Sequence, residues 1–239
     1  MAIKASRGVT EARKTRWIVA AGLIVVCQLV AASSRAQLLD PALPDPTMPR
    51  STPPPISAHY LQYGVALTGE AVASAGQVCP RTTNNLPCIL SDGGGLTVRV
   101  GYRGRGAWYL GGAYEFSRQD SANLLRLAIL QQLRTELRLY LTRVTRLAPY
   151  VGAAVGGAIY GNEWDLDTWG AASAVGVGTE FQVTPSIVLN VGALYRQLLL
   201  RRWTDGAGQS RATGPLGFGL AHMVALEFGF EIRDPLSRW

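Results

Sequence analysis

The stretch PYVGAAVGGAIYG, from Pro149 to Gly161, consists almost entirely of glycine, alanine and branched aliphatic residues. Its Gly152 and Gly156 form the G-x-x-x-G pattern of membrane-helix contacts, and its glycine density is also typical of phosphate-binding loops. A membrane helix is excluded because polar residues follow from Asn162 onward, too soon for a span of roughly 20 residues. A phosphate loop is excluded because no helical pattern follows the glycines. Small and aliphatic residues instead alternate with a period of two, which predicts a β-strand.

The same alternation recurs in seven further segments between residues 57 and 232. They are LQYGVALTGEA (61–71), LTVRVGYR (96–103), WYLGGAYEF (108–116), LLRLAILQQLRTELRLYLTR (124–143), WGAASAVGVGTEFQV (169–183), SIVLNVGALYRQLL (186–199) and GFGLAHMVALEFGFEI (217–232). Segment 124–143 is also a helix candidate, because it lacks glycine and proline and is rich in good helix formers. The alternation is clearest from Leu133 onward, so we expect a strand.

The connections between these eight segments alternate in length. Short connections lie near residues 103–106, 143–148 and 183–186, and longer polar ones near 74–93, 117–123, 161–168 and 202–216. An even number of antiparallel strands with short turns at one end and long loops at the other is the pattern of transmembrane β-barrels. The sequence therefore predicts an all-β fold, an eight-stranded antiparallel up-and-down transmembrane barrel over residues 57–232.

The two faces of the predicted strands differ in composition. One set of alternate positions is bulky and apolar, and the other is glycine, alanine and charge. In a membrane barrel the apolar set faces lipid, whereas a soluble barrel would turn it inward around a lipid-like ligand. Glycine suits the narrow lumen of eight strands, where arginine and glutamate can form bidentate pairs. We expect a lumen plugged by ion pairs, with a narrow path for ions or small solutes as the alternative. The predicted lumen charges are Glu70, Arg99, Arg103, Glu115, Arg134, Glu136, Arg138, Arg196, Glu227 and Glu231.

Aromatic residues near the predicted strand ends indicate two interfacial girdles, as bilayer interfaces favour. The girdle near the short turns would contain Tyr60, Tyr102, Trp108, Phe181 and Phe228, and the girdle near the long loops Phe116, Tyr160, Trp169, Trp203 and Phe218.

Residues 1–36 have the features of a cleaved secretory signal peptide. A basic segment precedes the apolar run from Trp17 to Ala32, and Ser34-Arg35-Ala36 is a small-x-small cleavage pattern. The run is short for a retained membrane anchor. Six basic residues and one acid lie in this segment, so only +2 of the formal net charge of +7 remains beyond it. This argues against nucleic-acid binding. Seven prolines make residues 37–56 an extended periplasmic linker, and residues 233–239 are expected to be a C-terminal tail.

Two cysteines remain beyond the signal segment, Cys79 and Cys88, in CPRTTNNLPC. An exported protein meets an oxidising compartment, so a local disulfide is expected. A zinc site would need more ligands, and no histidine lies nearby.

No combination of residues in the sequence predicts catalysis or a cofactor. The two histidines, His59 and His222, have no serine or acid at a recognisable spacing, although a pair assembled across strands would leave no such trace. The segment NEWDLD places Glu163, Asp165 and Asp167 at alternate positions beside Asn162. It could hold a cation weakly, but a solvated acidic loop is the expected role. We therefore expect no catalytic residue, no metal and no cofactor.

Residues 57–232 resemble the small eight-stranded outer-membrane barrels of the OmpA/OmpX type. The segment TRLAPYVGAAVGG (145–157) is similar to the place in such barrels where a periplasmic turn leads into a Pro-Tyr-aliphatic-Gly strand. The resemblance implies a monomer in the outer membrane of a Gram-negative bacterium, in contact with its lipid and inserted by the barrel-assembly machinery. That machinery reads a terminal aromatic residue, for which Trp239 or, within the last strand, Phe228 and Phe230 are the candidates.

Overall fold

The structure, a computed structural model, describes residues 59–79, 88–104, 106–120, 125–142, 146–162, 165–205, 208 and 210–236. The predicted signal peptide 1–36 and linker 37–56 lie outside these residues, as does Trp239.

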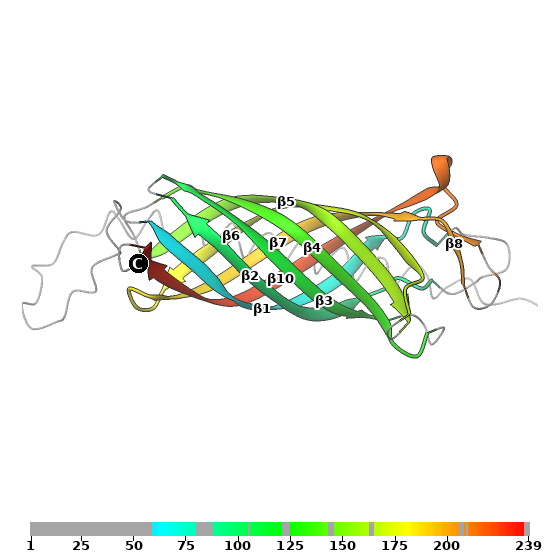
Figure 1. The fold of residues 1–239 in the computed structure, drawn as a ribbon, viewed down its shortest axis with the longest axis horizontal. Helices are drawn as coiled ribbons and strands as arrows, with labels where there is room; N and C mark the ends of the chain where they lie inside the picture. The colour runs from blue at the N-terminus through cyan, green and yellow to red at the C-terminus, as the bar shows by residue number, and fades with distance from the viewer. Residues whose placement is uncertain are drawn as a thin grey trace, which may run out of the picture. The chain divides into compact units, whose positions relative to one another are not determined.

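Eight long antiparallel strands close into a barrel (Figure 1). They are β1 (Tyr60–Ser74), β2 (Gly93–Arg103), β3 (Trp108–Gln119), β4 (Ala128–Tyr140), β5 (Leu147–Asn162), β6 (Thr168–Gln182), β7 (Ile187–Arg201) and β10 (Phe218–Pro235). Each pairs with its neighbour in sequence, and β10 closes the barrel against β1. The predicted eight-stranded up-and-down barrel is therefore confirmed.

Strand β4 resolves the one ambiguous segment of the sequence. Ala128–Tyr140 is paired along its full length with β3 on one side and with β5 on the other, so the helix alternative is excluded. Its leucines and arginines favour helix only by tenths of a kcal/mol per residue. Two neighbouring strands and a face pattern of period two outweigh that preference.

The register of the strands staggers steadily around the barrel. Following paired residues from Tyr60 through all eight strands returns to β1 at Glu70, ten residues further along. Strand number and stagger together fix the tilt and the width, and eight strands leave an interior that side chains just fill. The crowding is visible at Gly156, where an added Cβ would collide with the carbonyl oxygen of Leu133 on β4. The close approach of the β4 backbone therefore requires a glycine at this position.

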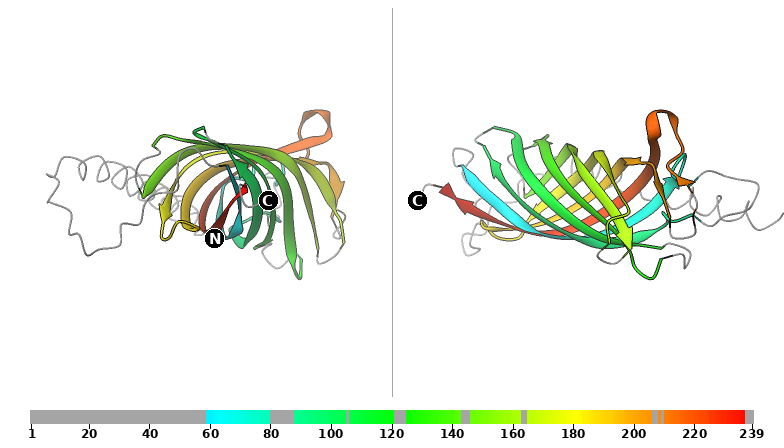
Figure 2. Two further views of the ribbon diagram at one scale, coloured as in Figure 1. Left: turned by 60° about the vertical axis from the view of Figure 1, so that its left-hand side comes forward. Right: turned by 45° about the vertical axis from the view of Figure 1, so that its right-hand side comes forward.

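The two ends of the barrel differ as the connection lengths predict. The turn end carries the short β2–β3, β4–β5 and β6–β7 connections, and the loop end carries the four longer ones. At the loop end, β8 (Trp203–Thr204) and β9 (Ser210–Arg211) form a small hairpin, followed by the 3-10 helix η1 (Pro215–Gly217) (Figures 1 and 2). Within the described residues, no helix is long and apolar enough to cross a membrane.

Strand β10 continues beyond the expected end of the barrel at Ile232. Its pairing with β1 runs to Asp234 and Pro235, which lie opposite Leu61 and Tyr60. A proline is tolerated at a strand end because it removes only one donor from the ladder. Residues 233–235, the first part of the expected C-terminal tail, are therefore the end of β10.

The aromatic girdles are only partly as predicted. Trp108 and Phe181 are exposed near the turn end, and Phe116 and Trp169 toward the loop end. Tyr60, Tyr160 and Trp203 are buried instead, and Phe228 lies mid-strand opposite Leu67. Alternation assigns Tyr60 and Tyr160 to inward positions of β1 and β5, a rule that should have overridden their place near the strand ends.

Candidate functional site

The ten charged residues predicted for the lumen all occupy inward positions of their strands. Nine are buried, and Arg103, at the turn end of β2, is partly buried. They come from six different strands, so the complete set is assembled only when the sheet is closed.

Arg196 on β7 joins the carboxylates nearest the loop end. Its Nη1 and Nη2 lie 2.6 and 2.8 Å from the two carboxylate oxygens of Glu115, a bidentate pair. Its Nη2 also lies 2.8 Å from Glu227, and its Nη1 contacts Glu70. One guanidinium thus connects β1, β3, β7 and β10. Arg134 supplies a second positive charge, 2.8 Å from Glu115.

Arg99 and Arg138 occupy the middle of the lumen. Arg99 lies 2.7 Å from Glu227, 3.1 Å from Glu231 and 3.7 Å from Glu136. Arg138 lies 3.1 Å from the same Glu231 and 3.4 Å from Glu136. Glu136, Glu227 and Glu231 therefore each pair with two or more arginines. Arg99 and Arg138 in turn each pair with two or more carboxylates.

Glu180 and Arg233 complete the network at the turn end, although the predicted set omits both. Glu180 accepts from Arg103 at 2.8 Å, from Arg138 at 3.3 Å and from Arg233 and Tyr140. Glu180 lies on the glycine-alanine face of its strand in the sequence, and Arg233 continues the alternation of Glu227 and Glu231. The alternation of inward and outward positions already places Glu180 inward. Extended beyond Ile232, it also places Arg233 inward.

The assembled network balances its charges. Six arginines and six glutamates project into the lumen from the eight long strands. Removing one partner from such a buried network leaves an uncompensated charge in the lumen. The network therefore contributes more to the specificity of the closed barrel than to its net stability.

The loop end of the lumen is apolar, which the sequence did not lead us to expect. Leu130, Leu198, Leu200 and Met223 point inward from β4, β7 and β10 and are fully buried. Val78, Ile89 and Leu90, from the ends of the β1–β2 loop, pack on them. Tyr160 donates its hydroxyl hydrogen to the carbonyl of Ile89 at 2.6 Å. We call this cluster the apolar cap; it covers the charged network.

The predicted disulfide between Cys79 and Cys88 is present and lies beside the apolar cap. The Cα atoms are 5.3 Å apart, and both cysteines pack against the cluster beside Val78 and Ile89. The bond thus fixes the two loop ends that contribute apolar side chains to the lumen.

Replacing both Cys79 and Cys88 with serine is expected to loosen this cover while the barrel stays folded. The cross-link removes about 2–3 kcal/mol of loop-closure entropy from the open state. We expect trypsin to cleave after Arg81, within the loop, at least about tenfold faster in the variant, as measured by mass spectrometry of the reduced fragments. Equal cleavage of the oxidised protein and the variant would show that the disulfide does not restrain the loop.

Neither histidine meets catalytic partners among the described residues. His59 stacks on Tyr102 at the turn end, with ring centroids 5.4 Å apart. His222 faces outward from β10, and its Nδ1 lies 2.6 Å from the Tyr195 hydroxyl.

The acidic segment is only partly described, since Glu163 lies outside the described residues. Asp167 lies close enough to Asp165 and Asp205 to feel their charge, and burial together with this repulsion raises the pKa of its carboxyl. In the part of the chain that can be described, no three acidic, histidine or cysteine side chains gather as a metal site would require.

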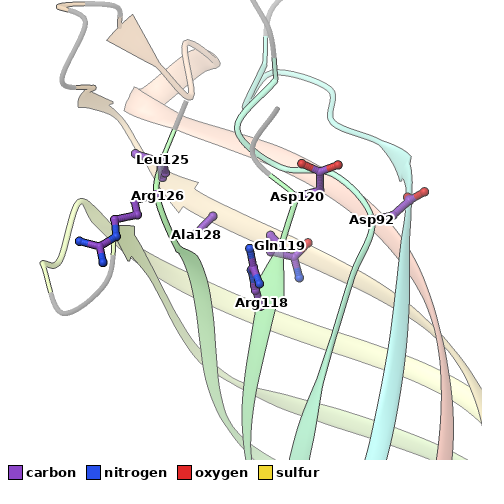
Figure 3. A pocket seen from close by; sticks show the side chains of 7 residues that line it. All are labelled: Asp92, Arg118, Gln119, Asp120, Leu125, Arg126 and Ala128. Atoms are coloured by element: carbon purple, nitrogen blue, oxygen red, sulfur yellow. The ribbon is translucent and has the colours of Figure 1, made fainter. Parts of the chain in front are cut away.

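A polar pocket opens at the loop end between β3 and β4 (Figure 3), with a volume of about 270 Å³. Gln119 donates its amide to Glu70 and to Ser117, which leaves its Oε1 without a described partner. The carboxylates of Asp92 and Asp120 and two arginines line the same pocket. Because these charges balance, the pocket does not favour an ion of either sign.

Comparisons with known proteins return structures only. No family model matches the chain, and no curated protein sequence matches it. Among solved structures, Neisserial surface protein A (NspA) matches at 15% identity over 73% of this chain and 96% of that chain, with a TM-score of 0.43. OprG from Pseudomonas aeruginosa matches at 13% identity over 74% of this chain and 96% of that chain, with a TM-score of 0.42. Outer membrane protein W from E. coli matches at 15% identity over 74% of this chain and 98% of that chain, with a TM-score of 0.44. The matching chains are small outer-membrane barrels, the class that the sequence pattern resembles.

Proposed function

We propose that this chain is an integral, non-enzymatic β-barrel of a Gram-negative outer membrane, with a structural or surface-interaction role and a plugged lumen. The observation that carries the proposal is the inverted polarity of the barrel. Leu67, Leu133 and Val155 point outward and are 65–67% exposed, whereas Arg196 and Glu231 point inward and are 0% exposed. In water the reverse distribution would be expected, whereas a hydrocarbon surround accepts the apolar exterior.

Two features of the interior support a plugged lumen. The charge network occupies the turn end and the middle of the lumen, and the apolar cap occupies the loop end. A hydrated ion crossing this path would have to separate paired charges and then pass the apolar side chains of the cap. This arrangement disfavours the alternative of a narrow pore.

The remaining parts of the proposal rest on the sequence. Residues 1–36 would direct export and be cleaved near Ala36, and residues 37–56 would form a periplasmic linker. The turn end would then face the periplasm and the loop end the exterior. Insertion by the barrel-assembly machinery and a monomeric state in outer-membrane lipid complete the proposal.

Cell fractionation and gel migration test the location. We expect the protein in the outer-membrane fraction and a shift in its migration on SDS gels between unboiled and boiled samples, because a closed barrel resists SDS until it is heated. Recovery from the periplasmic supernatant would contradict the membrane location. Equal migration of both samples would contradict a stable barrel.

Planar-bilayer recording tests the plug. We expect reconstituted protein to give no stable single-channel steps, because both the ion pairs and the apolar cap close the lumen. The control is the same preparation verified as folded by its heat-dependent migration. Reproducible steps from folded protein would favour the pore and contradict the plug.

A further inference from the structure

Two arginines without an ion-pair partner among the described residues lie in a groove at the loop end of the barrel. The groove has a volume of about 770 Å³ and is lined by Trp169, Arg201, Arg202, Trp203, Leu216 and Phe218, among others. Arg201 lies over the Trp169 ring, 5.7 Å from its centroid. Within the described part of the chain, Arg202 donates to the carbonyl of Gly214, at 3.4 Å. Neither guanidinium has an ion-pair partner among the described carboxylates, in contrast to Arg211, which pairs with Asp205 at 2.8 Å.

The groove opens on the apolar exterior of the barrel. Arg201 and Phe218 are register partners on neighbouring strands. Leu199, two residues before Arg201 on β7, and Leu220, two residues after Phe218 on β10, pair with each other and face outward. Leu216, in η1, is 96% exposed and adopts a φ of 63°, a strained conformation for leucine. The apolar side chain of Leu216 is thus exposed beside the guanidinium groups of Arg201 and Arg202. This combination suits a partner that has both an apolar and an anionic part.

A second, apolar slot adjoins the groove at Trp169. It has a volume of about 330 Å³ and runs between Tyr114, Leu133, Ile159 and Trp169. The slot exists because Gly157, between the outward-facing Leu133 and Ala171, has no side chain to fill it. Trp169 forms a wall of both spaces, so they share a boundary.

We infer that this surface binds a phosphate-bearing lipid, with one acyl chain in the Gly157 slot and its phosphate between Arg201 and Arg202. Guanidinium groups bind phosphate by charge-assisted, bidentate hydrogen bonds, and tryptophan favours the boundary between chains and headgroups. The inference rests on the proposed membrane location, which would place the loop end in the outer leaflet.

A soluble polyanion fits this surface less well than a lipid does. Asp165, Asp167 and Asp205 lie close together in the neighbouring loops. Asp205 directly follows Thr204, which lines the groove. A polyanion arriving from solution would meet these carboxylates, whereas a headgroup already held at the membrane surface would meet the arginines beside the apolar wall.

Native mass spectrometry of the full-length protein in neutral detergent, titrated with phosphatidic acid, tests the site. We expect the double variant Arg201→Gln/Arg202→Gln to bind at least about tenfold more weakly, since two charge-assisted contacts are lost. Gly157→Leu should also weaken binding, because its side chain would occupy the slot. Its Cβ would meet no backbone atom closer than 3.8 Å, so the strand should tolerate the change. The matched control is Arg118→Gln/Arg146→Gln, which removes two exposed arginines elsewhere and should bind as the parent does.

Three outcomes would overturn the inference. Unchanged binding by Arg201→Gln/Arg202→Gln would show that the two arginines do not bind the phosphate. Unchanged binding by Gly157→Leu would show that the slot does not hold an acyl chain. Equal competition by glycerol phosphate, which has no acyl chain, would indicate a site for soluble anions instead. Folding of every variant is checked by heat-dependent migration. A protein that folds but fails these tests leaves the proposed function standing, whereas one that never enters membranes contradicts both.

Discussion

Replacing Arg196 with methionine is expected to destabilise the folded barrel by about 3–5 kcal/mol, because it leaves buried carboxylates uncompensated. Glu70 would lose the one arginine with which it pairs among the described residues. Glu115 and Glu227 would keep Arg134, and Glu227 would also keep Arg99. The quantity to measure is the free energy of unfolding in urea, with the protein inserted in phosphatidylcholine vesicles.

Two further variants make this experiment specific. Arg118→Met removes an exposed arginine on β3 and should change the free energy of unfolding by no more than about 0.5 kcal/mol. The double variant Arg196→Met/Glu70→Gln should recover part of the loss, because the carboxylate left alone is neutralised. A loss in Arg196→Met no larger than in Arg118→Met would contradict the role of the network in holding the barrel closed.

Replacing Val155 with arginine is expected to cost about 2–4 kcal/mol if the exterior faces lipid, because the charge must enter hydrocarbon near mid-bilayer. Val155 is 66% exposed near the middle of β5, opposite Thr135 and Ser173. In water, a change at so exposed a position would cost no more than about 0.5 kcal/mol. The same unfolding measurement in vesicles therefore distinguishes a membrane barrel from a soluble one.

Val183 provides the matched control. It is 47% exposed and follows β6 in the short turn toward β7, at the end of the barrel. Val183→Arg adds the same charge outside the apolar band and should cost about 0–1 kcal/mol. If both substitutions are equally harmless, the outward-facing apolar residues do not contact hydrocarbon and the soluble alternative gains support.

The sequence predicted the strands and their faces because alternation is a local property. Opposite sides of a strand are set by parity alone, so each predicted lumen charge could be assigned inward without knowing its partner. The same rule gave the outward aliphatics of the opening glycine-rich stretch. The connection lengths then sufficed to order the strands.

Parity does not give the height of a residue along the barrel, and this limited the prediction. Leu198 and Leu200 occupy the inward parity of β7, as Arg196 does, yet they lie in the apolar cap because they are nearer the loop end. Whether an inward leucine is stable there depends on Val78 and Ile89, contributed by a distant loop. Register and loop packing are tertiary properties that alternation leaves open.

The last strand has a consequence for how the barrel forms. Before β10 docks, Arg99 has only Glu136, at 3.7 Å, because Glu227 and Glu231 both belong to β10. The same strand brings Arg233 to Glu180. A seven-stranded sheet would thus present unmatched charges that hold water in its open side. The interior would then lose its unmatched charges and its water in the same step, when the last strand pairs with the first.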